Sequence, residues 1–472
     1  MAKQFVHPYL PNSVPAIKEE MLKAIGVSQV EDIYHSVIPE ELLFKGKMDL
    51  PDPIVAEAAL KKHVLSLLSR NKSCDSMSSF LGAGCYHHYV PAICDEINSR
   101  AEFLTAYCGD TYSDHGKQQA IFEYTSLMAE LLDLDVVSYT TYDASQSLAS
   151  SLRMALRIQE AEGKHDRRVL LLPSTMNPEL FSQASEYCKG VGDLIRLKAD
   201  PMSLRIDLED LSDKLRTHPT AAIFYENPSY LGFLETGAKE IAELAHKHGA
   251  LVIAQADVAS LGVIESPANY GADIVCGDIQ PLGMHMQYGG GCAGFIATPY
   301  EKRFIQQYPT YLYGITTSKN PGEYGFGRAL NERTSHGARE KAKEFFGTET
   351  GLWSITAAVY LSLMGPQGMR ELGENILQIC QYARKELSKI NGIKLLPQEG
   401  YWFQEFILNF DQCDKTVADI NRRLLDFDIL GGKDLSGDFP ELGQSALYAV
   451  TELTTVEEIK KVARALEEIT GA

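Results

Sequence analysis

From about residue 136 to residue 297, short apolar runs alternate along the chain with amphipathic stretches. A strand that is buried on both faces is a continuous apolar run, so this alternation predicts crossover units around a mostly parallel sheet. The predicted strands are Val136–Tyr142, Arg168–Pro173, Asp193–Lys198, Ala221–Glu226, Leu251–Asp257, Asp273–Gly277 and Gly294–Ala297. The predicted helices between them are Ser147–Glu162, Asn177–Gly190, Asp207–Leu215 and Lys239–Gly249. The pattern therefore indicates an α/β fold.

The two ends of the chain carry different patterns. Helical periodicity runs through the first eighty or so residues, as in Pro15 to Ile25 and Pro53 to Leu68. The polar residues 318–343 have few apolar anchors, and we expect them to hinge or wrap rather than pack. The tail holds candidate helices and strands at Gly351–Met364, Glu371–Ile390, Phe403–Leu408, Ala446–Val450 and Val456–Ile469. We expect an N-terminal helical arm (1–80), a large α/β domain (81–330), and a hinge with a small C-terminal α+β domain (331–472).

Composition narrows the class of protein. With 472 residues, of which 45% are hydrophobic and 23% charged, the chain is long enough for two core-forming domains. A net charge of −19 would repel a nucleic acid, so we expect no such partner. Nine cysteines without a C-x-x-C pair are typical of reduced thiols. Because the sequence has neither a signal-peptide pattern nor an apolar run of about 18 residues, we expect a cytoplasmic protein with no membrane contact.

A carboxylate stands at the end of one predicted strand. The run Gly249–Asp257 ends on Asp257 and is followed by a second strand at Asp273–Gly277 and by the glycine-rich residues 289–291. Ligands of open α/β sheets bind beyond the carboxyl ends of strands, so Asp257 lies where a site is expected. A strand-end Asp before an Ala-Asp-Ile-Val strand resembles the large domain of pyridoxal-phosphate (PLP) enzymes of the aspartate aminotransferase type. In that fold the Asp pairs with the pyridine nitrogen of PLP; the alternative is that Asp257 only caps the next turn.

A lysine that such enzymes need is missing. They hold PLP as a Schiff base through a lysine just after the second of these strands, because an amine must attack the cofactor's aldehyde carbon. Here the corresponding residues are Gly277–Gly283, and no lysine occurs between Lys247 and Lys302. We therefore expect no covalently bound PLP on this chain.

Several strings along the whole chain are similar to subunit 1 (the α subunit) of two-subunit glycine decarboxylases, the P-proteins of the glycine cleavage system. They occur in family order at residues 80–91, 102–107, 119–124, 250–262, 270–283, 290–298, 339–342, 356–365, 439–442 and 449–459. The resemblance implies a PLP-dependent transferase-like fold and a partner β subunit (subunit 2) that carries the PLP lysine. It also implies a heterotetramer that decarboxylates glycine and passes the aminomethyl group to the lipoyl H-protein.

Other stretches depart from the family pattern. The segment Cys108–Gly116 replaces a Thr-Pro-Tyr-Gln-Pro-Glu type segment and is one residue shorter, and the family's Gly-Gly-Pro becomes Gly290-Gly-Cys292. These changes favour an alternative, a divergent pseudoenzyme or regulatory binding subunit of the same fold. A third hypothesis is an enzyme that binds PLP without a covalent bond, because Asp257 is present.

The resemblance also suggests residues of an active-site cleft. Tyr86, His87 and His88 could line a substrate channel, although paired histidines in an aromatic turn are as often structural. Ser145 and Ser147 open a predicted helix and could bind a phosphate, but without a lysine we expect them to cap the helix. We interpret Cys108 and Cys292 as small hydrophobic residues, and the charged residues 333–343 as a solvated helix face. No metal site is expected.

Overall fold

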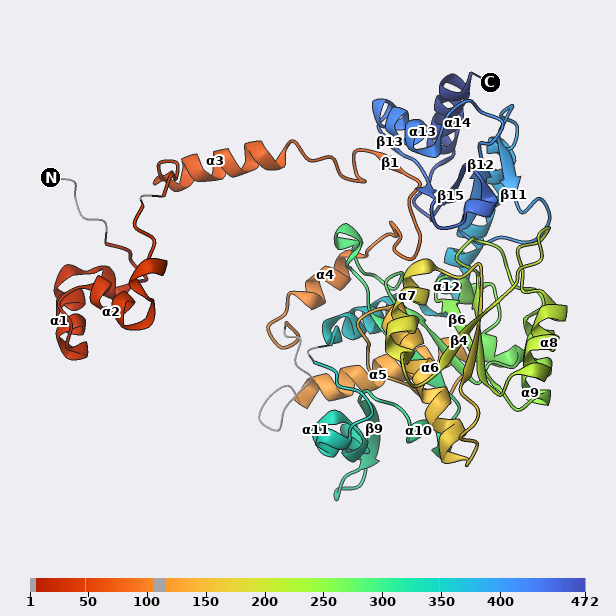
Figure 1. Ribbon diagram of the computed structural model, residues 1–472, viewed down its shortest axis with the longest axis horizontal. Helices are drawn as coiled ribbons and strands as arrows, with labels where there is room; N and C mark the ends of the chain where they lie inside the picture. Colours follow the sequence, from red (N-terminus) through yellow and green to blue (C-terminus); the bar gives the residue numbers. More distant parts are fainter. Residues whose placement is uncertain (1–5, 47, 105–114, 348, 472) are drawn as a thin grey trace. The chain divides into compact units, whose positions relative to one another are not determined.

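The computed structural model describes residues 6–46, 48–104, 115–347 and 349–471, and the chain forms two compact units, Met1–Asn71 and Lys72–Ala472 (Figure 1). The first unit contains α1 (Pro15–Ile25), α2 (Val30–Val37) and α3 (Glu57–Leu68), together with two single 3₁₀ turns. The predicted helices of this region are confirmed, except that α3 begins after the prolines. None of the described residues of this unit is buried.

A seven-stranded sheet forms the centre of the second unit. Its strand order is β2-β8-β7-β6-β5-β3-β4. The strands are β2 (Val136–Val137), β3 (Val169–Pro173), β4 (Asp193–Leu197), β5 (Thr220–Asn227), β6 (Leu251–Asp257), β7 (Ile274–Asp278) and β8 (Gly294–Thr298). The five strands from β7 to β4 are parallel, whereas β8 pairs antiparallel with both β7 and β2. The mostly parallel sheet is confirmed, although β2 is much shorter than the predicted strand.

Helices cover both faces of this sheet, because the buried strands present apolar side chains to each face in turn. Leu170 and Leu172 of β3 pack into the core under α6 and α7, whereas Leu171 packs into the core on the opposite face. The helices of this layer arrangement are α5 (His115–Leu132), α6 (Ala144–Ala161), α7 (Pro178–Cys188), α8 (Leu208–Thr217) and α9 (Ala238–Lys247). As predicted, α9 is followed by a left-handed glycine, Gly249, with φ 70°.

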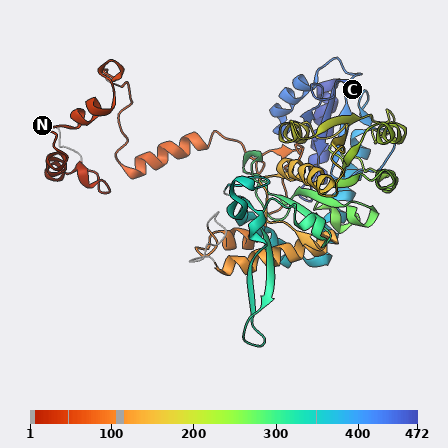
Figure 2. The same ribbon diagram turned by 60° about the horizontal axis from the view of Figure 1, so that its bottom comes forward.

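The polar segment 318–343 contains a strand, Tyr324–Ala329, which the sequence did not predict, whereas its scarcity of buried residues agrees with the prediction that it does not pack. Strands β9 (Leu312–Thr317) and β10 (Tyr324–Ala329) pair antiparallel as a hairpin, which Figure 2 shows projecting from the second unit. Two short helices flank the hairpin: α10 (Lys302–Ile305) precedes it, and α11 (Ser335–Ala338) follows it. Most of the hairpin is exposed, and this explains why its sequence has few apolar anchors.

A smaller sheet lies toward the C-terminus. Its order is β11-β12-β15-β14, and the strands are β11 (Lys394–Leu396), β12 (Glu405–Asn409), β14 (Lys433–Asp434) and β15 (Ser445–Ala449). It packs with α13 (Val417–Leu424) and α14 (Val456–Thr470) around a core of its own, which includes Phe80. The short strand β1 (Ser78–Ser79) pairs with β13 (Ile429–Leu430) beside it. The division into large and small domains at residue 330 stays a prediction.

The segment α12 (Gly351–Leu387) connects the two sheets. Gly365 interrupts it with φ 59° and ψ −177°, and Pro366 follows. Proline cannot continue the helical hydrogen bonds of the preceding turn, so the segment is two helices, as the sequence predicts. A short α4 (Ala92–Asn98) contacts the same segment. Across the described ranges, no helix combines the length and apolar character that a bilayer crossing requires.

Candidate functional site

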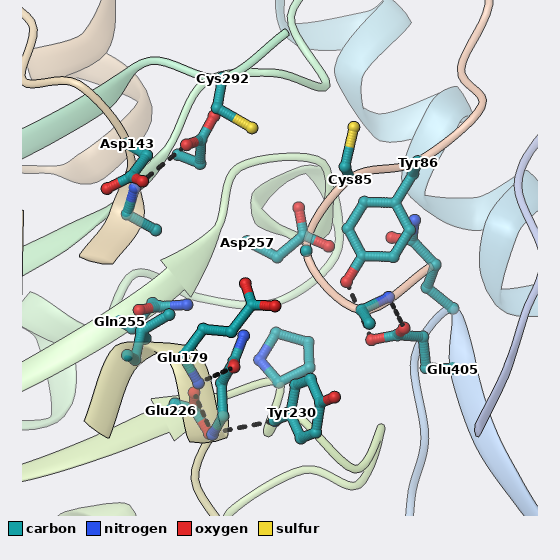
Figure 3. Close-up of a pocket in the computed structure, with 18 of the residues that line it drawn as sticks. Cys85, Tyr86, Asp143, Glu179, Glu226, Tyr230, Gln255, Asp257, Cys292 and Glu405 are labelled. Atoms are coloured by element: carbon teal, nitrogen blue, oxygen red, sulfur yellow. Dashed lines mark hydrogen bonds between the residues drawn. The ribbon is translucent and has the colours of Figure 1, made fainter. Parts of the chain in front are cut away.

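A cavity of about 200 Å³ lies at the carboxyl ends of the parallel strands. β5, β6 and β7 contribute Glu226, Asp257 and Asp278, and the start of α6 contributes Asp143. The loop before α4 contributes Cys85 and Tyr86, and β12 of the smaller sheet contributes Glu405. Figure 3 shows how Asp257 and Glu405 lie with Tyr86 around the cavity. The cavity therefore lies where an open α/β sheet places its ligands, as predicted for Asp257.

Asp257 caps the next turn, and its side chain also lines the cavity. One carboxylate oxygen, Oδ1, accepts a hydrogen bond from the backbone N–H of Ala259 at 2.9 Å, so Asp257 does cap the next turn. The side chain also points into the cavity (Figure 3). Burial raises the pKa of Asp257 above its ordinary value, while the nearby His88 opposes that rise.

Glu405 links the smaller sheet to the loop before α4. Its Oε1 accepts a hydrogen bond from the Ala83 N–H at 2.6 Å, and its Oε2 accepts one from the Tyr86 hydroxyl at 2.8 Å. Burial raises the pKa of Glu405 to about 8 and the pKa of Tyr86 well above its ordinary value. Because Ala83 and Tyr86 belong to one loop and Glu405 to the smaller sheet, this contact fixes the loop over the cavity.

Asp278 occupies the N-terminus of α6. Its Oδ1 accepts hydrogen bonds from the N–H groups of Gln280 at 2.9 Å and Ala293 at 3.1 Å, and its Oδ2 accepts one from Ala144 at 3.1 Å. Burial raises the pKa of Asp278 to about 7, against the effect of these three donors. At the same helix end, Asp143 accepts a hydrogen bond from Gln146 N–H at 2.8 Å and is the N-cap.

Glu226 is a further buried acid at this edge of the sheet. It accepts hydrogen bonds from the N–H groups of Asn177 at 3.3 Å and Tyr230 at 3.2 Å. Burial raises its pKa to about 7. With Glu179 as a sixth carboxylate, the cavity wall is dominated by acids, and none of its described lining residues is a lysine or an arginine.

These residues do not fit PLP. A phosphate needs cationic side chains or free N–H groups at a helix N-terminus, but the N-terminus of α6 already donates to Asp143 and Asp278. At the position of the expected lysine, the Gln280 side chain is fully buried and is bonded to Tyr86 N–H, Tyr86 O and Met284 O. Its amide is a structural link, and it offers no nucleophile to an aldehyde.

The structure brings three of the six predicted site residues to this cavity, namely Tyr86, Ser145 and Asp257. Ser147 is instead buried, and its hydroxyl is bonded to Thr141 Oγ1 at 2.7 Å and to the carbonyl of Asp143 at 3.0 Å. The expectation that Ser145 and Ser147 cap α6 was wrong, because Asp143 is the N-cap. The Asp side chain reaches the free N–H groups from the residue just before the helix, which neither serine can do from inside the first turn.

The two histidines lie outside the cavity lining. His88 is almost completely buried and contacts Glu452 Oε2 through Nδ1 at 2.8 Å. His87 is half-buried, and its carbonyl accepts a hydrogen bond from the Thr451 hydroxyl at 2.8 Å. Both contacts join the 83–91 loop to the segment after β15, which supports the structural interpretation of this aromatic turn.

Sequence reasoning missed several cavity residues. Cys292, interpreted as a small hydrophobic residue, lines the cavity together with Cys85, and both are free thiols (Figure 3). A hydrogen bond between the two thiols lowers the pKa of Cys85 and raises that of Cys292. Glu405 and Glu226 were missed because no local sequence signal distinguishes a buried acid. Residues 105–114, including Cys108 and most of the divergent Cys108–Gly116 loop, lie outside the described residues.

Low-identity structural neighbours share the fold. A sphingosine-1-phosphate lyase from Burkholderia pseudomallei is 13% identical, with a TM-score of 0.66 over 92% of this chain and 95% of its own. A cysteine desulfurase from Thermococcus onnurineus is also 13% identical, with a TM-score of 0.63 over 84% of this chain and 95% of its own. The predicted PLP-dependent transferase-like fold of the aspartate aminotransferase type is confirmed.

Closer relatives identify the family. A crystal structure of an inhibitor-bound glycine decarboxylase (P-protein) is 30% identical, with a TM-score of 0.82 over 98% of this chain and 100% of its own. The probable glycine dehydrogenase (decarboxylating) subunit 1 of Staphylothermus marinus is 37% identical over 98% of both chains. That of Aeropyrum pernix is 36% identical over 98% of this chain and 99% of its own. The family described as "Glycine cleavage system P-protein" matches residues 7–466, and the chain belongs to this family.

Proposed function

We propose that this chain acts as subunit 1 of a glycine dehydrogenase (decarboxylating), and that a lysine-bearing subunit 2 holds PLP. Relatives that carry the subunit 1 name match almost the whole chain. The proposal places glycine decarboxylation and aminomethyl transfer to a lipoyl H-protein in a cytoplasmic assembly of the two subunits. In this proposal the chain stabilises the assembly and forms one wall of the active-site cleft, whereas the chemistry on PLP takes place on the partner subunit.

The acidic cavity is the observation that carries this division of labour. A PLP phosphate in it would lie close to the carboxylates of Asp143, Asp257 and Asp278, and the described wall offers no cation to balance its charge. The raised pKa values of its buried acids already reflect the cost of placing negative charge there. A second anion would increase that cost, so this cavity disfavours PLP even without a covalent bond.

The relatives' names favour an enzyme subunit over the rival regulatory pseudoenzyme. That rival was motivated mainly by the Cys108–Gly116 loop. Nothing in the described part of the site favours it independently. It is therefore an outcome of the experiment below and not a second proposal.

Reconstitution tests the proposal. The chain is purified alone and together with a lysine-bearing chain of the same family, each is incubated with PLP and desalted, and the visible absorbance of the cofactor is measured. We expect no retained cofactor on the chain alone, cofactor on the pair, and exchange of the glycine carboxyl group with bicarbonate only by the pair. Exchange that is absent from a well-formed, PLP-loaded pair would favour the pseudoenzyme.

Two variants sharpen the test of the cavity. Asp257→Asn removes the carboxylate that could pair with a pyridine nitrogen, and Asp200→Asn is the matched control because Asp200 lies outside the cavity. We expect neither variant to change the cofactor content of the isolated chain. PLP bound by the isolated wild-type chain and lost in Asp257→Asn alone would show that this chain has a cofactor site of its own.

A further inference from the structure

A second cavity, of about 390 Å³, lies at the opposite edge of the central sheet. Its wall is formed by the C-terminal half of α6, by the connection from α6 to β3, and by Gly190 and Val191 just before β4. The acidic cavity lies at the carboxyl ends of the parallel strands. Several residues of the second cavity instead lie just before the amino ends of β3 and β4. The two cavities are therefore separate.

The wall of this second cavity is basic. Of its ten lining residues, five are arginine or lysine and one is histidine, whereas Glu160 is the single acid among them. The basic residues are Arg153, Arg157, Lys164, His165, Arg167 and Arg168. In a chain with a net charge of −19, such a concentration of positive charge is unlike the average surface. It creates a local potential that attracts anions.

Three of the arginines are held in place by fixed acceptors. Arg168 donates from Nε to the carbonyl of Val191 at 3.2 Å and from Nη2 to that of Gly190 at 3.0 Å. Arg167 donates from Nη1 to the carbonyl of Thr220 at 2.8 Å. Arg157 pairs with the buried Glu344 at 3.1 Å and donates to the carbonyl of Gln307 at 3.0 Å. These bonds orient the guanidinium groups before any ligand arrives, so less side-chain entropy is lost on binding.

Not all of the donors are satisfied. Within the described part of the chain, Arg153, Arg167 and Arg168 form no ion pair, whereas Arg157 pairs with Glu344 and Lys164 with Glu162. Arg157 itself is neutralised by the buried Glu344, so the uncompensated positive charge of the wall belongs to the other three arginines. Arg153 is half-buried, and its side chain makes no hydrogen bond to any described residue. An anion in the cavity would receive these bonds and balance these charges.

We infer that this cavity is a binding site for a small phosphorylated metabolite that carries at least two negative charges. Guanidinium groups bind the oxygens of phosphate in pairs, and donors on several sides of the cavity suit a tetrahedral group better than a planar carboxylate. The cavity is bounded on several sides and the chain as a whole is acidic, which excludes a nucleic-acid strand. This inference does not depend on the proposed function of the chain.

Calorimetric titration of the full chain at low ionic strength tests this site, with inorganic pyrophosphate as the probe and citrate as a carboxylate of comparable charge. Arg153→Gln removes the unpaired arginine, and Arg422→Gln is the matched control with the same change of charge, because Arg422 is exposed and pairs only with Asp419. We expect saturable binding of pyrophosphate to the wild type. Arg153→Gln should weaken it at least about tenfold, which is about 1.4 kcal/mol, and Arg422→Gln should not change it.

Circular dichroism establishes that both variants are folded, and Arg153→Lys serves as a second variant that keeps the charge but loses the guanidinium fork. We expect Arg153→Lys to bind with an affinity between those of the wild type and Arg153→Gln. Three results would overturn the inference: no saturable heat with pyrophosphate, equal weakening in Arg422→Gln and Arg153→Gln, or binding of citrate that is as tight as that of pyrophosphate.

Discussion

Asp278 Oδ2 lies 3.1 Å from the backbone nitrogen of Ala144 and accepts its hydrogen bond, so a carboxylate from β7 sits at the N-terminus of α6. In phosphate-binding folds a helix N-terminus is free to receive the ligand. Here the protein's own Asp278 carboxylate accepts a hydrogen bond from the first N–H group of α6, and it also joins the loop before β8 through Ala293. This contact closes a place that a cofactor phosphate would need.

The three hydrogen bonds to Asp278 should make it a stability determinant. Asp278→Ala leaves the N–H groups of Ala144, Gln280 and Ala293 without an acceptor in a buried place, and we expect a loss of about 3 kcal/mol in the free energy of unfolding. Asp278→Asn keeps one oxygen and should cost less. Urea denaturation of both variants measures the difference. Equal losses would contradict a role for the carboxylate oxygens as acceptors.

Gly294 should tolerate no side chain. A Cβ at this position would lie well inside van der Waals contact with Ser147 Oγ, Thr141 Oγ1 and the carbonyl of Asp143, all of which belong to the network at the start of α6. We expect Gly294→Ala to lower stability by about 3 kcal/mol. The control is Gly290→Ala in the loop before β8, where the added Cβ meets only Gln287 O at 3.5 Å. Thermal unfolding compares the two, and similar midpoints would contradict the packing argument.

The contact between His88 and Glu452 should be structural. His88→Ala would remove the imidazole that bonds the partly buried Glu452 carboxylate and would empty a buried site, and we expect a loss of about 2 kcal/mol. His87→Ala is the matched control, because His87 is half-buried and its contact with Thr451 is made by the backbone carbonyl, so about 1 kcal/mol or less is expected. Chemical denaturation of both variants checks the order. A larger effect at His87 would reverse this interpretation.

The buried acids should make stability depend on pH. Burial raises the pKa values of Glu226 and Asp278 to about 7 and that of Glu405 to about 8, whereas acids in an unfolded chain titrate near about 4. Between these values the folded protein keeps protons that the unfolded chain has released, so the contribution of these groups falls as the pH rises from about 4 to about 8. The apparent midpoint of thermal unfolding, measured across this range at constant ionic strength, should decrease.

Glu405→Gln provides the control for this pH dependence. The amide keeps an oxygen for the Ala83 N–H but cannot ionise, so the decrease in the unfolding midpoint above about pH 6 should become smaller. A slope identical to that of the wild type would mean that Glu405 ionises in the folded protein as easily as in the unfolded chain.

Much of the fold could be predicted, because the local pattern of apolar and polar residues indicates which segments are buried. The strand Leu251–Asp257 was predicted with its observed bounds, since it is an apolar run that ends at a carboxylate facing the cavity. Gly365 and Pro366 separated the two predicted helices within α12 for a steric reason that acts over one turn. The hairpin Leu312–Ala329 was missed, because its exposed strands do not need an apolar pattern.

The sequence by itself determined the sheet-and-helix order, the position of Asp257 and the absence of a lysine after β7, because each of these depends on residues close together in the chain. Only the tertiary structure decided which acids share the cavity. Tyr86 and Glu405 are 319 positions apart, and Ala144 and Asp278 are 134 positions apart. Such contacts depend on how strands and loops pack, which no local sequence pattern encodes. The burial that results from this packing raises the pKa values of these acids.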